Sequence, residues 1–162
     1  MRAELQALTV RVATLEQKEA QRSGMVSLVG TYALDRTAFG EQLVQGALKS
    51  TAAYLAGIED AEERARAREA IEDTARRQAE QAELSLTLSP DGTFVMQLKL
   101  EGEAEESRGT WTSREAAIEL RVTHRDEEAL GTAEAMTARL AGGTLRLKPS
   151  PDDAVVFVLQ KR

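Results

Sequence analysis

The alternation of apolar and polar positions changes its period near Leu84. From Leu84 to Ser89, leucines alternate with serine or threonine, which is the period of two expected of a half-buried strand. The alternation returns in several later segments, which are separated by tight turns such as residues 89–92 and Gly142-Gly143. Short strands joined by hairpin-length turns are typical of an antiparallel meander. We therefore predict one β-meander from about Leu84 onward.

A further strand is predicted ahead of the meander, at residues 28–34. It brings the number of strands to about eight, which is enough to close a barrel that is filled by side chains or holds one small ligand. We favour a barrel over a sandwich because the later connections have hairpin length and because closure removes exposed strand edges. The predicted fold is mainly β with α, an up-and-down meander barrel of about eight antiparallel strands.

The segment between the first and second predicted strands has helical periodicity. Asp35 and Thr37 are suitable N-cap residues. The apolar residues that share one face of the following helix are Phe39, Leu43, Ala47, Tyr54 and Ile58. Gly57 is expected to end or loosen this helix, and residues 59–83, rich in Ala, Glu and Arg, indicate a second, solvated helix. We expect a helical hairpin at residues 37–83 that lies on the barrel or over its mouth.

Residues 1–24 are predicted to be an N-terminal helix, separate from a barrel domain at residues 25–162. Leu5, Leu8, Val12 and Leu15 recur at spacings of three and four, which resembles the seam of a short coiled coil. The seam covers about two heptads, fewer than the three or four of a firm coiled-coil assignment. Two interpretations remain open, a helical tail and the end of a stalk that self-associates or tethers the chain to a membrane.

Charge and composition argue against several classes of function. The chain has 21 basic and 27 acidic residues, a net charge of −6, and no basic cluster with interleaved aromatics, so we expect no nucleic-acid partner. The absence of cysteine excludes disulfides and thiolate metal sites. No apolar run approaches the ~20 residues of a transmembrane helix, and the N-terminal residues lack the apolar core of a signal peptide.

His124 is the single histidine of the chain. It has the parity of Leu120 and Val122, so we expect it to point into the barrel near the end of a strand. A catalytic or metal-binding role requires partner groups of the right type, and the sequence places none beside it. The acidic residues 101–106 also lack the pattern of a calcium loop. We predict no catalytic residues, no metal, no cofactor and no enzymatic activity.

Three motifs follow one another along the chain: Gly30-Thr31-Tyr32, the Asp-Gly-Thr-Phe of residues 91–94, and Gly109-Thr110-Trp111. A terminal strand that ends with residues 156–162 follows them. In their order and spacing the motifs resemble the lipocalin-like (calycin-type) β-barrel proteins of bacteria. The resemblance implies a barrel that can bind an apolar ligand, and an exported or envelope-associated protein of a group in which many members have no assigned function.

Two functions are consistent with these observations. The first is a non-enzymatic lipocalin-like module that binds a small apolar ligand inside the barrel, under the helical hairpin. The alternative is a structural or protein-interaction module of the bacterial envelope with a solidly packed barrel. The side chains expected at the ligand site are Tyr54, Phe94, Met96, Leu98, Trp111, Leu120 and Met136, and Val122 is expected inside the barrel with them.

The stalk interpretation predicts that the full chain self-associates and that a chain beginning at Met25 does not. The shorter chain lacks the apolar seam that includes Leu5 and Leu15, and with it the surface that holds a coiled coil together. Light scattering of the two chains at equal concentration measures the difference. Two monomeric masses would rule out the stalk.

Overall fold

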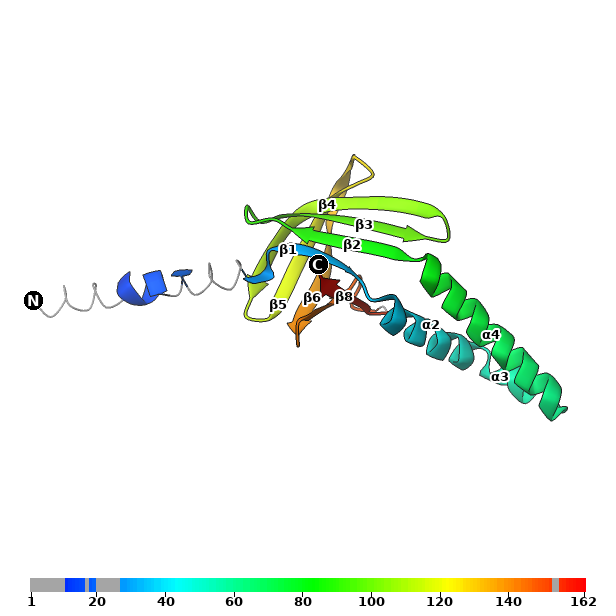
Figure 1. The fold of residues 1–162 in the computed structure, drawn as a ribbon. Helices are drawn as coiled ribbons and strands as arrows, with labels where there is room; N and C mark the ends of the chain where they lie inside the picture. The colour runs from blue at the N-terminus through cyan, green and yellow to red at the C-terminus, as the bar shows by residue number, and fades with distance from the viewer. Residues whose placement is uncertain (1–10, 17, 20–26, 153–154) are drawn as a thin grey trace, which may run out of the picture.

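The computed structural model describes residues 11–16, 18–19, 27–152 and 155–162. Within these residues, antiparallel strands form one closed barrel in which each strand pairs with its neighbours in the sequence and the last pairs with the first (Figure 1). The strands are β1 (Gly30–Leu34), β2 (Glu83–Leu88), β3 (Thr93–Leu100), β4 (Glu103–Arg114), β5 (Ala117–Arg125), β6 (Glu128–Ala141), β7 (Thr144–Lys148) and β8 (Phe157–Lys161). The predicted eight-stranded up-and-down barrel is confirmed.

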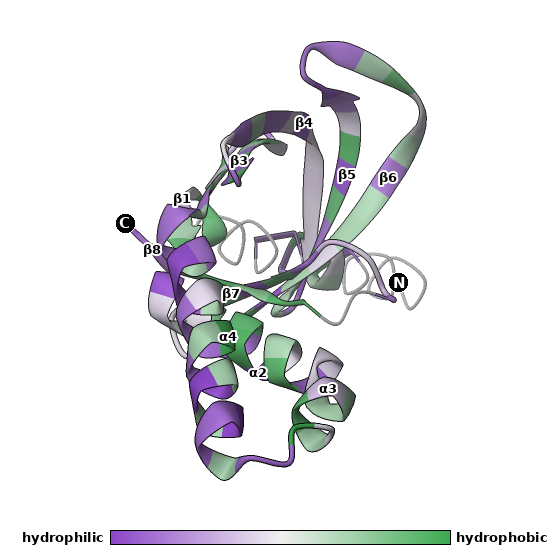
Figure 2. Ribbon diagram, turned by 90° about the vertical axis from the view of Figure 1, so that its right-hand side faces the viewer, coloured by the Kyte–Doolittle hydropathy of each residue, from purple (hydrophilic) through white to green (hydrophobic). Residues whose placement is uncertain are grey.

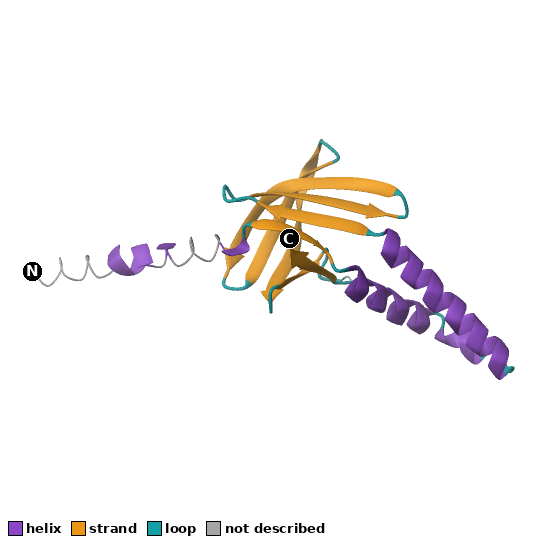
Figure 3. Ribbon diagram, viewed as in Figure 1, coloured by secondary structure: helices purple, strands orange, loops and turns teal. Residues whose placement is uncertain are grey.

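Helices separate β1 from β2, as predicted (Figure 3). They are α2 (Arg36–Ser50), α3 (Ala52–Ala56) and α4 (Ala61–Gln81). The first predicted helix is in fact two helices, which meet at Thr51, where the backbone leaves the helical conformation and the hydroxyl donates to the Ala47 carbonyl at 2.7 Å. Gly57 ends α3, as expected. Residues 11–16 and 18–19 are also helical.

The N-terminal seam is described only in part. Val12 and Leu15 are exposed over 48% and 62% of their surfaces, and Leu5 and Leu8 lie outside the described residues. The self-association of this segment therefore stays a prediction.

The apolar core fills the inside of the barrel. Alternate residues of each strand point inward, and the register places Tyr32 of β1 opposite Leu86 of β2, which in turn lies opposite Met96 of β3. The hydroxyl of Tyr32 donates to the Leu28 carbonyl at 2.7 Å, and the indole N–H of Trp111 donates to the Ser89 carbonyl at 3.0 Å. Both large aromatics thus satisfy their polar atoms with the barrel's own backbone.

The helical hairpin extends away from the barrel (Figures 1 and 2). Helices α2 and α4 pack closely through small residues, since a Cβ on Gly40 would lie 3.3 Å from the Cβ of Ala79. At the base of the hairpin, the ring of Phe39 packs on that of Phe157 of β8 at 5.4 Å between centroids. The prediction that the first helix lies on the barrel or over its mouth is therefore wrong for most of its length. Its apolar face is used mainly against α4.

A β-bulge in β5 corrects the predicted orientation of His124. The register of β5 shifts between Val122 and His124, so that His124 pairs with Arg108 and Arg125 pairs with the buried Ser107. One extra residue reverses the parity of every position beyond it. His124 is accordingly exposed on the outer side, and Arg125 takes the inward position.

We predict that Gly109→Ala strongly destabilises the barrel. A Cβ at this position would overlap the carbonyl oxygen of Arg121 and lie 2.8 Å from its carbonyl carbon, so the β4–β5 pairing must shift to accept it. We expect a loss of about 3 kcal/mol or more in the free energy of unfolding. Urea denaturation measures this loss, with Gly131→Ala as the matched control because a Cβ there meets open space. Equal midpoints for the two variants would contradict the predicted packing.

Candidate functional site

The structure brings together six of the seven predicted ligand-site residues. Five of them are buried in the barrel core with Val122, and Leu98 is half-buried at its edge. The five buried residues are Phe94, Met96, Trp111, Leu120 and Met136. Tyr54 does not join them. It lies on α3 at the far end of the hairpin with 64% of its surface exposed, which corrects its predicted place at the ligand site between the helices and the barrel (Figure 1).

The interior residues form a packed core. Trp111 of β4, Tyr32 of β1, Phe94 of β3, Leu145 of β7 and Leu159 of β8 are each at most 2% exposed and belong to one apolar cluster. Side chains from opposite walls of the barrel thus share the same interior. Protein interiors packed in this way reach the density of organic crystals. The predicted lining residues therefore act first as the core on which barrel stability depends.

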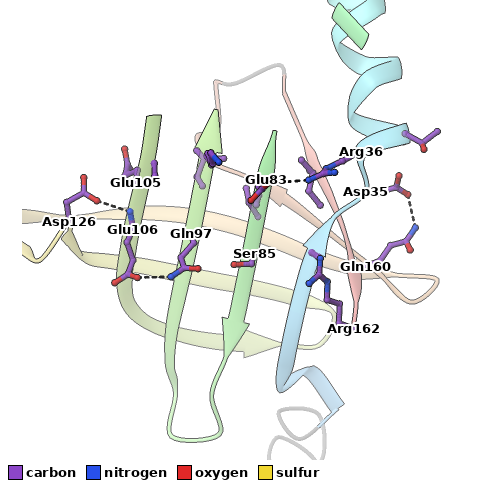
Figure 4. Close-up of a pocket in the computed structure, with 17 residues that line it drawn as sticks. Asp35, Arg36, Glu83, Ser85, Gln97, Glu105, Glu106, Asp126, Gln160 and Arg162 are labelled. Carbon is purple, nitrogen blue, oxygen red and sulfur yellow. Dashed lines mark hydrogen bonds and ion pairs between the residues drawn. The ribbon is translucent and has the colours of Figure 1, made fainter. Parts of the chain in front are cut away.

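A hollow of about 1190 Å³ is lined by β8, β1–β4 and the start of α2 (Figure 4). Its lining includes Leu84, Leu98 and Glu105 from inward positions as well as residues from outward positions of the strands. One row of directly paired residues crosses it, namely Gln160, Ala33, Ser85, Gln97 and Glu106. The short side chains of Ala33 and Ser85 leave the middle of the row low, between longer side chains at each end. Of the lining residues, sequence reasoning predicted Leu98 at a ligand site. It missed the row itself because the residues of the row occupy outward positions of their strands, where a polar side chain is ordinarily a solvated one.

Hydrogen bonds already occupy the carboxylates at both ends of this row. Gln97 Nε2 donates to Glu106 at 3.0 Å and Arg108 Nε donates to the same carboxylate at 2.6 Å. Donation by Gln97, followed by that of Arg108, lowers the pKa of Glu106 below its ordinary value. At the other end, Gln160 Nε2 donates to Asp35 at 2.7 Å (Figure 4). The hollow therefore offers a mixed polar surface in which both carboxylates already have hydrogen-bond partners.

An ionic cluster lies on the inward face of the strands, where the bulge has turned Arg125 inward. Its guanidinium donates to Glu134 at 2.6 Å, and its Nε lies 2.9 Å from the carboxylate of Glu105. The second contact is an ion pair without hydrogen-bond alignment, since this buried Nε has no aligned acceptor. The buried Ser107 hydroxyl donates to Glu105 at 3.3 Å. With side chains 40–54% exposed, these pairs contribute at most about 1 kcal/mol each and link β4, β5 and β6.

The described residues offer few groups for catalysis. The ring of His124 contacts its neighbour in the chain, with Nδ1 3.0 Å from the Thr123 hydroxyl. Across the described part of the chain, no three His, Asp or Glu side chains are gathered in a way that suits a metal ion. Nor does any described helix have the length and apolarity to cross a membrane. The absence of enzymatic activity stays a prediction.

Comparisons of the chain with protein-family profiles, with curated proteins and with solved structures find no match. The lipocalin-like relationship is therefore a prediction for which the shape of the barrel is the available support. The function has to be argued from the geometry of this molecule.

We predict that the Glu106 carboxyl titrates below its ordinary pKa of 4.5 and that Gln97→Leu raises its pKa toward that value. The substitution removes the amide that donates to the ionised form, while the Arg108 contact remains. Carboxyl-detected NMR titration of the two proteins measures the pKa directly. Gln160→Leu is the matched control, because Gln160 bonds to Asp35 at the opposite end of the row. An unchanged pKa of Glu106 in Gln97→Leu would contradict the geometry described.

Proposed function

We propose that this chain is a non-enzymatic interaction module in which a packed barrel holds a helical hairpin out for contact with another protein. The observation that carries the proposal is the filled interior of the barrel. A barrel whose central side chains pack on one another uses its interior for stability. Its contacts with other molecules are then made by the outer surface.

The two largest interior aromatics favour this function over the binding of an apolar ligand within the barrel. Trp111 and Tyr32 are at most 2% exposed, and each donates a hydrogen bond to backbone at the rim. A drug-sized ligand needs a cavity of roughly 300 Å³ or more. Making such a space around these rings would break both bonds and separate the leucines that pack on them, at a cost of several kcal/mol.

The base of the hairpin is attached firmly to the barrel, as a presented surface requires. Gln42 of α2 donates to the Val156 carbonyl at 2.7 Å and accepts from the Val156 N–H at 3.2 Å. Arg36 Nε donates to the Ala82 carbonyl at 3.1 Å, which ties the start of α2 to the end of α4. Because each helix also continues directly into a strand, the hairpin is held at both ends. A surface fixed in this way loses little conformational freedom when it binds.

The proposal predicts that protein purified without detergent carries no bound apolar molecule. Native mass spectrometry gives the mass of the chain, and a thermal shift with palmitate or with an apolar dye reports any uptake. Because the interior is filled by its own side chains, we expect the mass of the bare chain and an unchanged unfolding midpoint. A co-purified lipid, or a midpoint raised by palmitate, would favour the lipocalin-like function instead.

Leu120→Ala tests the same packing from the opposite direction. Leu120 is fully buried in the barrel core, so its truncation should lower the free energy of unfolding by about 2–5 kcal/mol. Urea denaturation measures the loss. The half-buried Leu98 supplies the matched control, since Leu98→Ala removes the same atoms from the edge of the core and should cost less. A loss at Leu120 no larger than that at Leu98 would contradict a solidly packed interior.

A further inference from the structure

The end of the hairpin farthest from the barrel presents an apolar surface, which we call the tip and define as residues 51–58. No charged residue occurs in this segment. Ala52, Ala53, Tyr54 and Ala56 are exposed, and Tyr54 is the most exposed large apolar side chain of the described residues, at 64%. The ribbon of α3 is coloured largely as apolar in Figure 2, whereas much of α4 is hydrophilic. The tip therefore differs in character from the helix beside it.

Local hydrogen bonds hold the backbone of the tip in one conformation. The N–H of Gly57 donates to the carbonyls of Ala53 and Tyr54, at 3.2 and 3.1 Å. Arg64 reaches back from α4, and its guanidinium donates to the Ile58 carbonyl at 3.0 and 2.6 Å. Half-buried Leu55 and Ile58 lie in the same short segment as the exposed residues. Tyr54 is thus presented on a preorganised turn, and the entropic cost of binding through it is small.

Acidic residues follow the tip directly. Glu59, Asp60, Glu62 and Glu63 are all exposed, and the nearest basic residues along the chain are Lys49 and Arg64. The guanidinium of Arg64 is bonded to the Ile58 carbonyl, and Asp60 caps α4 by accepting from the Glu63 N–H at 2.8 Å. Arg66 pairs with Glu62 at 3.5 Å. Four carboxylates against the three cations Lys49, Arg64 and Arg66 leave the border of the tip negative, with Glu59 and Glu63 as the carboxylates that the partner can meet. A partner that binds the tip therefore needs positive charge around its binding surface.

Resting on the interaction function proposed above, we propose that the tip docks into an apolar pocket on a partner protein whose border carries Lys and Arg. Tyrosine is among the residues most often found at the energetic centre of protein interfaces, and its hydroxyl tolerates the polar edge of a pocket. A basic border pairs with Glu59 and Glu63 beside the tip, which speeds encounter and selects the partner. Charge complementarity thus identifies the occupant.

The same charges disfavour the other occupants of an apolar tip. A second copy docking tip to tip places identical acidic borders against each other, because a two-fold interface brings each patch against itself. An anionic lipid surface repels the carboxylates in the same way. The acidic border of the tip therefore repels a second copy of the chain and an anionic lipid surface, whereas it attracts a partner with a basic border.

Selection of a random dodecapeptide phage library on the immobilised full chain tests the proposal with a defined probe. We expect the enriched peptides to combine Lys or Arg with aromatic or aliphatic residues. Fluorescence anisotropy should show that Tyr54→Ala weakens their binding by about tenfold or more, whereas Tyr54→Phe retains most of it. Neutralising Glu59 and Glu63 together (E59Q/E63Q) should weaken binding and reduce its dependence on salt.

Val155→Ala is the matched control, since it shortens a different exposed apolar residue, and it should leave binding unchanged. Tyr54 is exposed, so Tyr54→Ala should keep the circular dichroism spectrum and unfolding midpoint of the parent chain. Enriched peptides that bind Tyr54→Ala as well as the parent would overturn the docking site and leave the interaction function standing. A library that yields no enriched peptide, or peptides without basic residues, would also overturn it.

Two further measurements cover the competing occupants. Binding of the chain to phosphatidylcholine–phosphatidylglycerol vesicles that is lost in Tyr54→Ala would assign the tip to a lipid surface and overturn the proposal. Light scattering that shows a dimer dissociated by Tyr54→Ala would assign it to a second copy, with the same consequence. Palmitate found inside the barrel would instead refute the interaction function on which the proposal rests.

Discussion

The pairing of β1 with β8 is the interaction on which the rest of this structure depends. The two strands are short, five residues each, and they close a barrel whose other strands follow one another by tight turns. Backbone bonds extend the pairing at both ends, from the Asp35 N–H to the Val158 carbonyl at 2.8 Å and from the Arg162 N–H to the Thr31 carbonyl at 2.9 Å. Without this closure, β1 would be a separate strand joined to the meander only through β2 and a long helical insertion.

Closure also explains where the hairpin stands. β1 and β2 are adjacent in the barrel, so the chain leaves and re-enters at neighbouring points, and whatever lies between must be a hairpin. Its two long helices bury their apolar faces against each other, through the small residues Gly40, Ala75 and Ala79. They consequently need the barrel only at their base, where Phe39 and Gln42 contact β8 and the residue before it. The barrel interior and the hairpin are thus independent surfaces, and a function carried by one does not require the other.

Much of the fold could be read from alternation and turn chemistry. Leu84, Leu86 and Leu88 alternate with polar residues and do point inward, and the Gly92 turn has the positive φ of +84° that glycine accepts. His124 and Tyr54 were placed wrongly for two different reasons. Parity counting assumes an unbroken register, and the bulge after Val122 breaks it. An apolar helical face shows that a surface will be buried, but it leaves open which element covers that surface. Here α4, and not the barrel, covers most of the apolar face of α2.

The sequence by itself determined the strands, their turns and the helical insertion, because these follow from local periodicity and from short connections. It indicated a closed barrel only through the number of strands, and the pairing of β1 with β8 that closes it is a tertiary contact. Tertiary structure alone decided that the interior is filled, that the row from Gln160 to Glu106 crosses a hollow, and that Tyr54 stands at the tip of the hairpin. Each of these outcomes depends on the register between strands or on the direction in which two packed helices leave the barrel. Such long-range relations arise from contacts between residues far apart in the chain, and local pattern carries no record of them.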